Sequence, residues 1–339
     1  MQHATAQVIE RNEESFELGI KRLFIEPPAC SHCAAVTQSD VMTFNYRSFE
    51  YFEANGFTSV RFGLDHDALK DAAFQQVVIF MPKSKQELEF YIDLAQSVIA
   101  EDGEVYLVGE KKSGIASGAK RLVARASSAD KIDSAKHCQL WEARGLERLP
   151  PLKLADYFDY IDVSVGDTSF KVASLPGVFA QGKFDEGTQL LLEQNIRRMK
   201  ARTLDFGCGA GVIGAVLKLR NPDISIEAID INWLALRATE ETYRLNGIDG
   251  KVYASDGWKN VQGRVNGVVT NPPFHQGVST EYETTEHFIR TAHSKMARYA
   301  PMYIVANNFL RYPTVIESVF GKCTYYAKSS KFNVYYCER

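Results

Sequence analysis

A glycine-rich segment in the second half of the chain has the residue types and spacing of a ligand-binding loop. It reads Leu204-Asp205-Phe206-Gly207-Cys208-Gly209-Ala210-Gly211 and lies between an apolar run and a stretch with helical spacing. Glycines permit a sharp turn and let the backbone approach a ligand that a Cβ atom would block. The loop alone also fits a plain tight turn or, because Gly214 follows at a suitable distance, a dinucleotide site.

Two acidic residues narrow the choice of ligand. Asp230 ends the next apolar segment, 25 positions after Asp205, where a carboxylate can accept hydrogen bonds from both ribose hydroxyls of an adenosine. That position suits NAD and S-adenosylmethionine alike, and it also suits a cap for the helix expected from Trp233. Asp205 ends a predicted buried strand, which is unfavourable unless its carboxylate fixes loop amides or meets a cation. S-adenosylmethionine carries an ammonium group, whereas NAD has no cationic amino-acid tail.

The motif Asn271-Pro272-Pro273-Phe274 supplies the chemistry that the loop leaves open. Its two prolines fix the backbone and leave their carbonyls without local amide partners. An amino group on an aromatic ring is a poor nucleophile because its lone pair is delocalised. The Asn271 side-chain oxygen and the Pro272 carbonyl can accept its two hydrogens and direct the lone pair toward a methyl group, while Phe274 stacks on the base. The combined motifs predict methyl transfer from S-adenosyl-L-methionine to an exocyclic amino nitrogen.

The elements around these motifs alternate between strands and helices. We expect strands at 202–206, 224–230, 265–270 and 302–306, helices at 212–220, 233–245 and 283–297, and a terminal hairpin of 323–327 with 332–337. Such alternation predicts an α/β fold with a mostly parallel seven-stranded sheet, helices on both faces and an antiparallel edge.

A break at Leu149-Pro150-Pro151 divides the chain, because proline disfavours helix and suits a connector. The N-terminal half repeats the strand–helix rhythm more faintly and has no glycine-rich loop after any strand. We therefore expect two tandem Rossmann-like methyltransferase domains. Residues 1–155 form a degenerate domain that binds no cofactor, and residues 156–339 form the catalytic domain.

Composition and charge exclude several classes of protein. No run approaches the roughly 20 apolar residues of a membrane span, and the polar N-terminus is not a secretory signal, so we expect a cytoplasmic protein without membrane contact. Residues 170–339 carry a formal charge of +5 and residues 1–169 carry −8, which makes the C-terminal half the better candidate for meeting phosphates. The segment Cys30-Ser31-His32-Cys33 has metal-ligand spacing, but no second pair follows, and we expect no metal.

The C-terminal half resembles the class I S-adenosylmethionine-dependent methyltransferases, and more closely the RsmC-type guanine-N2 methyltransferases of bacterial 16S ribosomal RNA. The resemblance covers most of the chain and implies two methyltransferase-like domains, of which only the second binds cofactor. Besides the glycine loop, it is carried by Leu175-Pro176-Gly177-Val178-Phe179, Asp185-Glu186-Gly187-Thr188-Gln189-Leu190-Leu191-Leu192, Asn271-Pro272-Pro273-Phe274-His275-Gln276-Gly277, Ile304-Val305-Ala306-Asn307-Asn308-Phe309-Leu310, Met81-Pro82-Lys83-Ser84-Lys85 and Val108-Gly109-Glu110.

The resemblance implies roles for further residues. Gly187 and Thr188 would lie over the methionine end of the cofactor, and Asp256 would approach the adenine amino group, although Asp256 fits a turn before glycine equally well. His275 is not needed as a base, because the amine can lose its proton to water after transfer. The expected catalytic residues are Asn271, Pro272 and Phe274. The expected cofactor contacts are Gly187, Thr188, Asp205, Gly207, Cys208, Gly209, Gly211, Asp230, Ile231, Asp256, Gly257 and Asn271.

The expected reaction is direct methylation of the exocyclic N2 of a specific guanine in 16S rRNA, by a monomeric enzyme whose partner is that RNA or the 30S subunit. The guanine must leave its stack to reach the site, so we expect base flipping. A 23S rRNA guanine-N2, DNA adenine-N6 or protein glutamine-N5 methyltransferase uses the same two acceptors and stays an alternative. A role as a non-catalytic assembly factor fits the N-terminal domain better than the whole chain. A function as a nicotinamide oxidoreductase would not explain the motif at 271–274.

Overall fold

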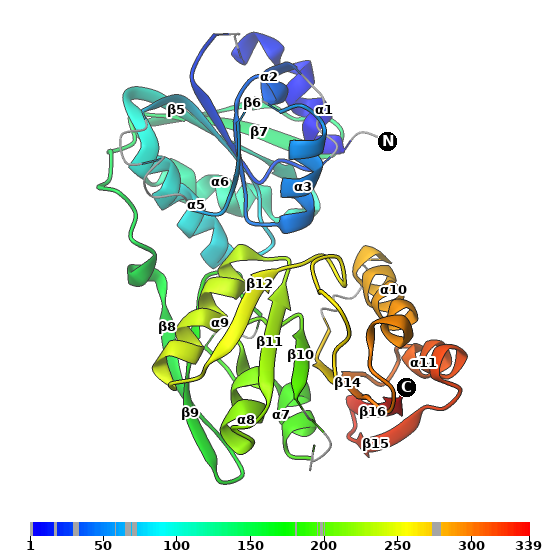
Figure 1. The fold of residues 1–339 in the computed structure, drawn as a ribbon. Helices are drawn as coiled ribbons and strands as arrows, with labels where there is room; N and C mark the ends of the chain where they lie inside the picture. The colour runs from blue at the N-terminus through cyan, green and yellow to red at the C-terminus, as the bar shows by residue number, and fades with distance from the viewer. Residues whose placement is uncertain are drawn as a thin grey trace. The chain divides into compact units, whose positions relative to one another are not determined.

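The computed structural model of the chain forms two compact units, Met1–Tyr157 and Phe158–Arg339 (Figure 1). Each unit has its own sheet and its own core, and each is described separately. The structure describes residues 3–16, 19–29, 34–57, 59–64, 69, 73–179, 182–194, 196, 199, 201–272 and 279–339.

The N-terminal unit contains a seven-stranded sheet in the order β3-β2-β1-β4-β5-β7-β6. Its strands are parallel except β7, which runs antiparallel to both of its neighbours. The strands are β1 Arg22–Ile25, β2 Asp40–Thr43, β3 Ser59–Phe62, β4 Phe74–Phe80, β5 Ile99–Glu110, β6 Ser128–Asp133 and β7 Cys138–Arg144. The α-helices are α1 Ala4–Arg11, α2 Ala34–Thr37, α3 Tyr46–Ala54, α5 Lys85–Val98 and α6 Ile115–Val123.

The C-terminal unit contains a second seven-stranded sheet, in the order β12-β11-β10-β13-β14-β16-β15. A separate antiparallel hairpin of β8 and β9 precedes it. The strands are β8 Asp159–Val165, β9 Thr168–Ser174, β10 Arg202–Phe206, β11 Ser225–Asp230, β12 Gly250–Ala254, β13 Gly267–Thr270, β14 Pro301–Asn307, β15 Thr324–Lys328 and β16 Phe332–Glu338. The helices are α7 Glu186–Leu192, α8 Val212–Arg220, α9 Trp233–Leu245, α10 Ser279–Lys295 and α11 Tyr312–Phe320.

The two seven-stranded sheets have the same topology. When β1 is matched with β10, the remaining strands follow in the same spatial order and with the same antiparallel pair at one edge. The order reverses beside the first strand of each sheet, since β10 pairs with β11 on one side and β13 on the other. The prediction of tandem α/β domains with mostly parallel seven-stranded sheets is therefore confirmed, and each sheet has the kind of switch point where doubly wound folds bind ligands.

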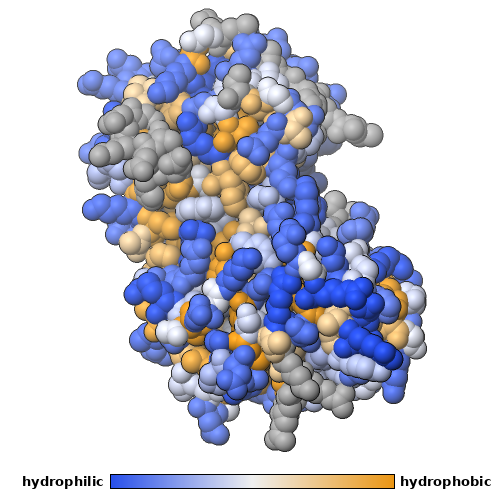
Figure 2. Space-filling view, in the orientation of Figure 1, coloured by the Kyte–Doolittle hydropathy of each residue, from blue (hydrophilic) through white to orange (hydrophobic). Residues whose placement is uncertain are grey.

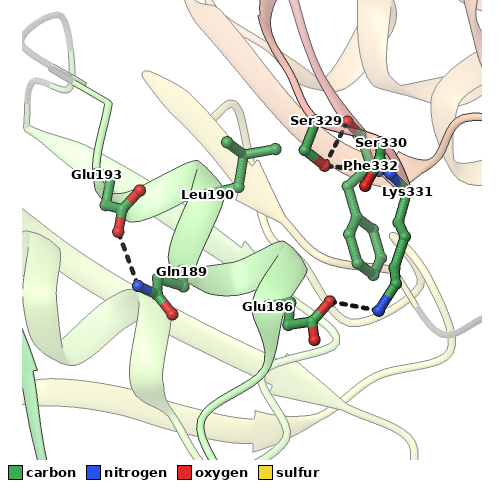
Figure 3. Close-up of a pocket in the computed structure, with 8 residues that line it drawn as sticks. All are labelled: Glu186, Gln189, Leu190, Glu193, Ser329, Ser330, Lys331 and Phe332. Atoms are coloured by element: carbon green, nitrogen blue, oxygen red, sulfur yellow. Dashed lines mark hydrogen bonds and ion pairs between the residues drawn. The ribbon is translucent and has the colours of Figure 1, made fainter.

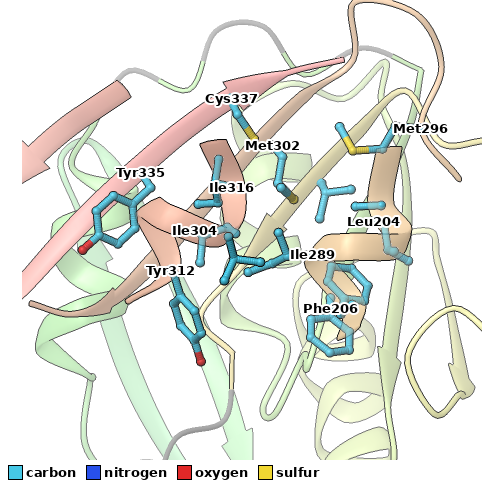
Figure 4. Packing of buried hydrophobic residues seen from close by; sticks show 14 of the residues in the cluster. Leu204, Phe206, Ile289, Met296, Met302, Ile304, Tyr312, Ile316, Tyr335 and Cys337 are labelled. Atoms are coloured by element: carbon cyan, nitrogen blue, oxygen red, sulfur yellow. The ribbon is translucent and has the colours of Figure 1, made fainter. Parts of the chain in front are cut away.

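The core of the C-terminal unit lies between its sheet and the helices α10 and α11 (Figure 4). Strands covered on both faces read as continuous apolar runs, and β13 is buried at every residue. Removing a large apolar side chain from water stabilises the fold by about 1.5–3 kcal/mol, so this cluster fixes the sheet firmly. Its members include Leu204, Phe206, Ile289, Met296, Met302, Ile304, Tyr312, Ile316, Tyr335 and Cys337.

Hydrophilic side chains cover most of the face seen in Figure 2, and hydrophobic residues form small patches between them. Few large apolar side chains are more than half exposed; these are Tyr160, Phe179, Tyr299 and Phe309 among the residues that the structure describes. Among the residues that the structure describes, no helix is long and apolar enough to cross a bilayer.

Candidate active site

The predicted site residues come together at the carboxyl ends of the central strands of the second sheet. Parallel pairing aligns the end of β10 with β11 through Phe206 and Ile229, and the end of β11 with β12 through Asp230 and Ala254. The next strand, β13, ends at Thr270, whose hydroxyl donates to the Phe206 carbonyl over 2.7 Å. The glycine loop, Asp230 and the residue after Thr270 therefore share one edge of the sheet, although 64 positions separate Gly207 from Asn271 in the chain.

The glycine loop is held by backbone hydrogen bonds to the neighbouring strand. The amides of Gly207 and Cys208 both donate to the Ile229 carbonyl, over 2.9 and 3.0 Å. Gly207 and Gly209 have φ values of 69° and 55°, in the left-handed region that favours glycine. A Cβ atom added to Gly209 would meet nothing within 4 Å, so the backbone is open there for a close approach by a ligand.

Gly211, unlike Gly209, is closely surrounded by other atoms. It precedes α8 with φ 75°, and a Cβ atom there would lie 2.8 Å from the Thr239 side chain on α9. The Thr239 hydroxyl also donates to the Gly209 carbonyl and to the Cys208 thiol, which is buried. Gly211 is therefore required for packing, and Cys208 can offer a ligand only its backbone. Burial raises the pKa of the Cys208 thiol well above its ordinary value.

The Asp230 carboxylate accepts backbone hydrogen bonds on both of its oxygens. Its Oδ2 accepts from the Gly209 amide over 3.1 Å, and its Oδ1 accepts from the Asn232 amide over 2.9 Å. Burial raises the pKa of Asp230, while these amides oppose the rise. The side chain that caps α9 is Asn232, which accepts from the Leu234 amide, and not Asp230. Capping therefore does not account for Asp230, whose carboxylate oxygens can also accept from hydroxyl donors.

Asp205 is fully buried at the end of β10. Its Oδ2 accepts from the Gly214 amide in α8 over 2.9 Å, while its Oδ1 has no hydrogen-bond partner among the described residues. Burial raises the pKa of Asp205 to about 7, and the negative charge of Asp230 adds to the rise. An unpaired buried carboxylate oxygen is costly unless the group is protonated or a cation reaches it.

Asn271 follows β13, and its amide nitrogen is held by two residues of another element. Nδ2 donates to Asp185 Oδ2 over 2.8 Å and to Thr188 Oγ1 over 2.9 Å. Asp185 also caps α7, because the same oxygen accepts from the Thr188 amide over 2.7 Å. Asp185 was not among the predicted site residues. A capping position ahead of an apolar run marks it in the sequence, but no local pattern connects it with Asn271.

The remaining residues of the proline motif are only partly described. Pro272 is buried directly after Asn271. Pro273, Phe274 and His275 lie outside the described residues, so the expected stacking by Phe274 stays a prediction.

Asp256, Gly257 and Ile231 lie beside Asp230. The Ser255 amide donates to the Asp230 carbonyl over 3.1 Å, which brings the turn after β12 next to the end of β11. Gly257 has φ 59° and an added Cβ atom would meet nothing within 4 Å, as at Gly209. The Asp256 carbonyl accepts from the Lys259 amide, so the turn interpretation and the adenine-contact interpretation of Asp256 are compatible.

An aromatic stack anchors this edge of the site. The rings of Phe206 and Phe288 lie 3.7 Å apart at an interplanar angle of 5°, and those of Phe288 and Trp258 lie 4.5 Å apart at 4°. The Trp258 indole also donates to the Phe288 carbonyl over 2.9 Å. The end of β10, the turn after β12 and α10 are thereby fixed to one another.

Gly187 and Thr188 are buried in the first turn of α7. A cavity of about 220 Å³ opens on the outer side of this helix, between α7 and the turn into β16 (Figure 3). Lys331 of that turn pairs with Glu186 over 2.9 Å, and the Phe332 ring lies 3.1 Å from the place of a Cβ atom on Gly187. None of the residues lining the cavity is a predicted site residue, so we do not assign the reaction to this cavity.

Within the described part of the chain, no three His, Cys, Asp or Glu side chains gather as a metal site requires. Cys30 and Cys33 lie outside the described residues. The described cysteines Cys138, Cys208, Cys323 and Cys337 are all free thiols.

Comparison with known proteins gives a methyltransferase-related family for each unit. Residues 169–336 match the methyltransferase small domain, and residues 6–160 match the methyltransferase small domain N-terminal family. The protein named ribosomal RNA small subunit methyltransferase C from Aliivibrio salmonicida is 35% identical over 91% of this chain and 89% of its own length. The protein of that name from Pseudoalteromonas translucida is 39% identical over 85% of this chain and 86% of its own.

A solved structure has the same fold over both units. It is the T. thermophilus 16S rRNA N2 methyltransferase RsmC in complex with AdoMet and guanosine, which matches with a TM-score of 0.87 and 19% identity. The match covers 99% of this chain and 92% of that chain. Similarity over nearly the full length of these relatives, together with the site geometry, assigns the chain to the ribosomal RNA small subunit methyltransferase C family.

Proposed function

We propose that the protein transfers a methyl group from S-adenosyl-L-methionine to the exocyclic N2 of a specific guanine in 16S rRNA. The observation that carries the proposal is the arrangement of Asn271, whose nitrogen is bound to Asp185 and Thr188 so that its oxygen is left to accept from a target amine. The names of the relatives and the guanosine bound to the RsmC neighbour support guanine N2 as the acceptor.

The residues at the carboxyl edge of the sheet fit S-adenosylmethionine. The unpaired Asp205 Oδ1 can accept from the ammonium group of S-adenosylmethionine, and the Asp230 carboxylate can accept from the ribose hydroxyls of the cofactor. The backbone is unobstructed at Gly209 and Gly257, which leaves room for the cofactor at the same edge of the sheet. Asp256 would accept a hydrogen bond from the adenine amino group. We assign Gly187, Thr188, Gly207, Cys208, Gly211, Ile231 and Asn271 to the same site. When bound, the cofactor supplies an electrophilic methyl group on its sulfonium.

The protein's own residues orient the acceptor and stabilise the charge that develops on it. Asn271 Oδ1 and the Pro272 carbonyl accept the two hydrogens of the guanine amino group, which turns its lone pair toward the methyl carbon. The carbon–sulfur bond breaks as the carbon–nitrogen bond forms, and the amine then loses a proton to water. The guanine reaches the site by flipping out of its stack, with Phe274 as the stacking partner.

The two domains divide this work, with residues 156–339 performing catalysis. Residues 1–155 bind no cofactor and position the RNA or the 30S subunit, or support folding of the second domain. The enzyme acts as a monomer. Static light scattering on the purified protein tests this: a mass near 38 kDa agrees with it, and twice that mass contradicts it.

The test is methylation of ribosomal material from a strain that lacks the activity. Protein with methyl-labelled S-adenosylmethionine is incubated with 30S subunits, 50S subunits and free rRNAs, and the labelled nucleoside is identified after digestion. We expect N2-methylguanosine from 16S rRNA, and a loss of about 100-fold or more in Asn271→Ala. Asn55→Ala, which changes an exposed asparagine at the end of α3, is the matched control. Label only in 50S material moves the substrate to 23S rRNA, and no RNA label points to protein amides or DNA.

A further inference from the structure

The asparagine of the site can perform its proposed task in only one of two side-chain orientations. A carboxamide is nearly symmetrical in shape, but one end accepts hydrogen bonds and the other end donates them. With Oδ1 toward the target amine, Asn271 accepts a hydrogen. After a 180° rotation it would present Nδ2, and two donors would face each other.

Among the described residues, Asp185 and Thr188 accept hydrogen bonds from the Asn271 nitrogen, and they differ in the side-chain orientations that they allow. The Thr188 hydroxyl, 2.9 Å away, can donate or accept and would tolerate either orientation. The Asp185 carboxylate, 2.8 Å away, can only accept, so it pairs with the nitrogen and repels the oxygen. We infer that Asp185 is a positioning residue, which selects the one Asn271 orientation that can bind the target amine. This inference rests on the proposed amino-methyl transfer.

Asp185 is itself fixed in place by the helix that it caps. Its Oδ2 accepts from the Thr188 amide over 2.7 Å as well as from Asn271. Gly187 lies close beneath the carboxylate, since a Cβ atom there would be 3.2 Å from Oδ2 and 3.1 Å from the Phe332 ring. One oxygen therefore joins the first turn of α7 to the end of β13, and a side chain at position 187 would be tightly packed against it.

Two substitutions separate positioning from capping. Asp185→Ser keeps a good N-cap for α7, because serine and aspartate are about equally favourable there, but its short hydroxyl no longer excludes the wrong amide orientation. Asp185→Asn keeps both the cap and an acceptor oxygen toward Asn271. We expect Asp185→Ser to lower kcat by about 10-fold, the effect of a hydrogen bond to a charged group, with unchanged melting temperature and unchanged S-adenosylmethionine affinity. Asp185→Asn should restore most of kcat.

A double-mutant cycle tests whether Asp185 acts through Asn271. If it does, Asp185→Ser lowers kcat in the wild-type background and causes no further loss in Asn271→Ala, measured in single turnovers with labelled cofactor. The same fold loss in both backgrounds overturns the inference, as does an Asp185→Ser enzyme with wild-type kcat.

A measurement on the protein alone keeps this inference separate from the proposed function. The side-chain amide signals of Asn271, assigned by their absence in Asn271→Ala, are followed in ¹⁵N–¹H spectra. We expect two distinct, slowly exchanging protons in the wild type and a changed pair in Asp185→Ser. An unchanged pair overturns the positioning role even if no RNA is methylated, whereas the changed pair without RNA methylation removes only the proposed function.

Discussion

Glu26 occupies in the N-terminal unit the backbone position that Gly207 occupies in the C-terminal unit. Each is the first residue after the central strand, and each amide donates to the neighbouring strand, Glu26 to Met42 over 2.8 Å and Gly207 to Ile229 over 2.9 Å. Both have left-handed backbones, with φ 57° and 69°. The Glu26 carboxylate accepts from the hydroxyl of Thr43, the residue that takes the place of Asp230. The N-terminal unit thus carries a carboxylate side chain at the position where the C-terminal unit has Gly207.

The titration of Glu26 should be visible in the stability of the protein. Burial raises the pKa of Glu26 from 4.5 to about 7. Between these values the folded state holds a proton that the unfolded state has lost, so stability falls as pH rises through this window. Glu26→Gln keeps the acceptor oxygen and removes the titration.

We expect Glu26→Gln to match the wild type near pH 4.5 and to exceed its free energy of unfolding by about 3 kcal/mol at pH 8. Urea denaturation at both pH values measures the difference. Glu53→Gln, at an exposed position of α3, is the matched control. Parallel curves for Glu26→Gln and wild type would rule out a raised pKa at this residue.

Asp205 should show opposite effects on stability and on ligand binding. Burial raises the pKa of its carboxyl from 3.8 to about 7, so without cofactor stability falls as pH rises between these values and stays lowered above them. We expect Asp205→Asn to raise the melting temperature of the cofactor-free protein at pH 8 and to weaken S-adenosylmethionine binding by about 10-fold, because the cationic partner is lost. Scanning fluorimetry and calorimetric titration give the two values. Unchanged affinity would contradict the assignment of Asp205 to the ammonium group.

Gly214 and Tyr243 form a close contact behind the glycine loop. A Cβ atom on Gly214 would lie 2.0 Å from the Tyr243 hydroxyl, which is buried and has no hydrogen-bond partner among the described residues. Gly214→Ala should therefore lower the free energy of unfolding by about 1–3 kcal/mol. Adding Tyr243→Phe removes the hydroxyl and should recover part of the loss, although the ring carbon Cζ stays 3.1 Å away. Urea denaturation of the single and double variants measures this, and purely additive effects would contradict the contact.

The elements predicted from periodicity are those with long apolar patterns. The strands at 202–206 and 224–230 and the helices at 212–220 and 233–245 agree with β10, β11, α8 and α9 to within about a residue. Strand β12 was not predicted, because Gly250–Ala254 is short, partly exposed and at the edge of the sheet. Helix α7 was not predicted either, since its seven residues begin with a charged residue and a glycine.

The site was predictable only where its residues form a local motif. The glycine loop and Asn271 each carry their signal within a few residues. The partnership of Asn271 with Asp185 spans 86 positions and depends on where α7 packs, which no local pattern contains. Glu26 is similar: a glutamate rarely adopts a left-handed backbone, and only the strand pairing shows that it takes the place of a glycine.

The central position of β10 also orders the events of folding. Thr203 pairs with Ile226, 23 residues later in β11, and with Gly267, 64 residues later in β13. Closing the longer loop costs about 1 kcal/mol more in chain entropy, so we expect β10 and β11 to associate first. The glycine loop and Asp230 belong to that early pair, whereas Asn271 arrives with β13. The half of the site that holds adenosine would thus take shape before the half that selects the base.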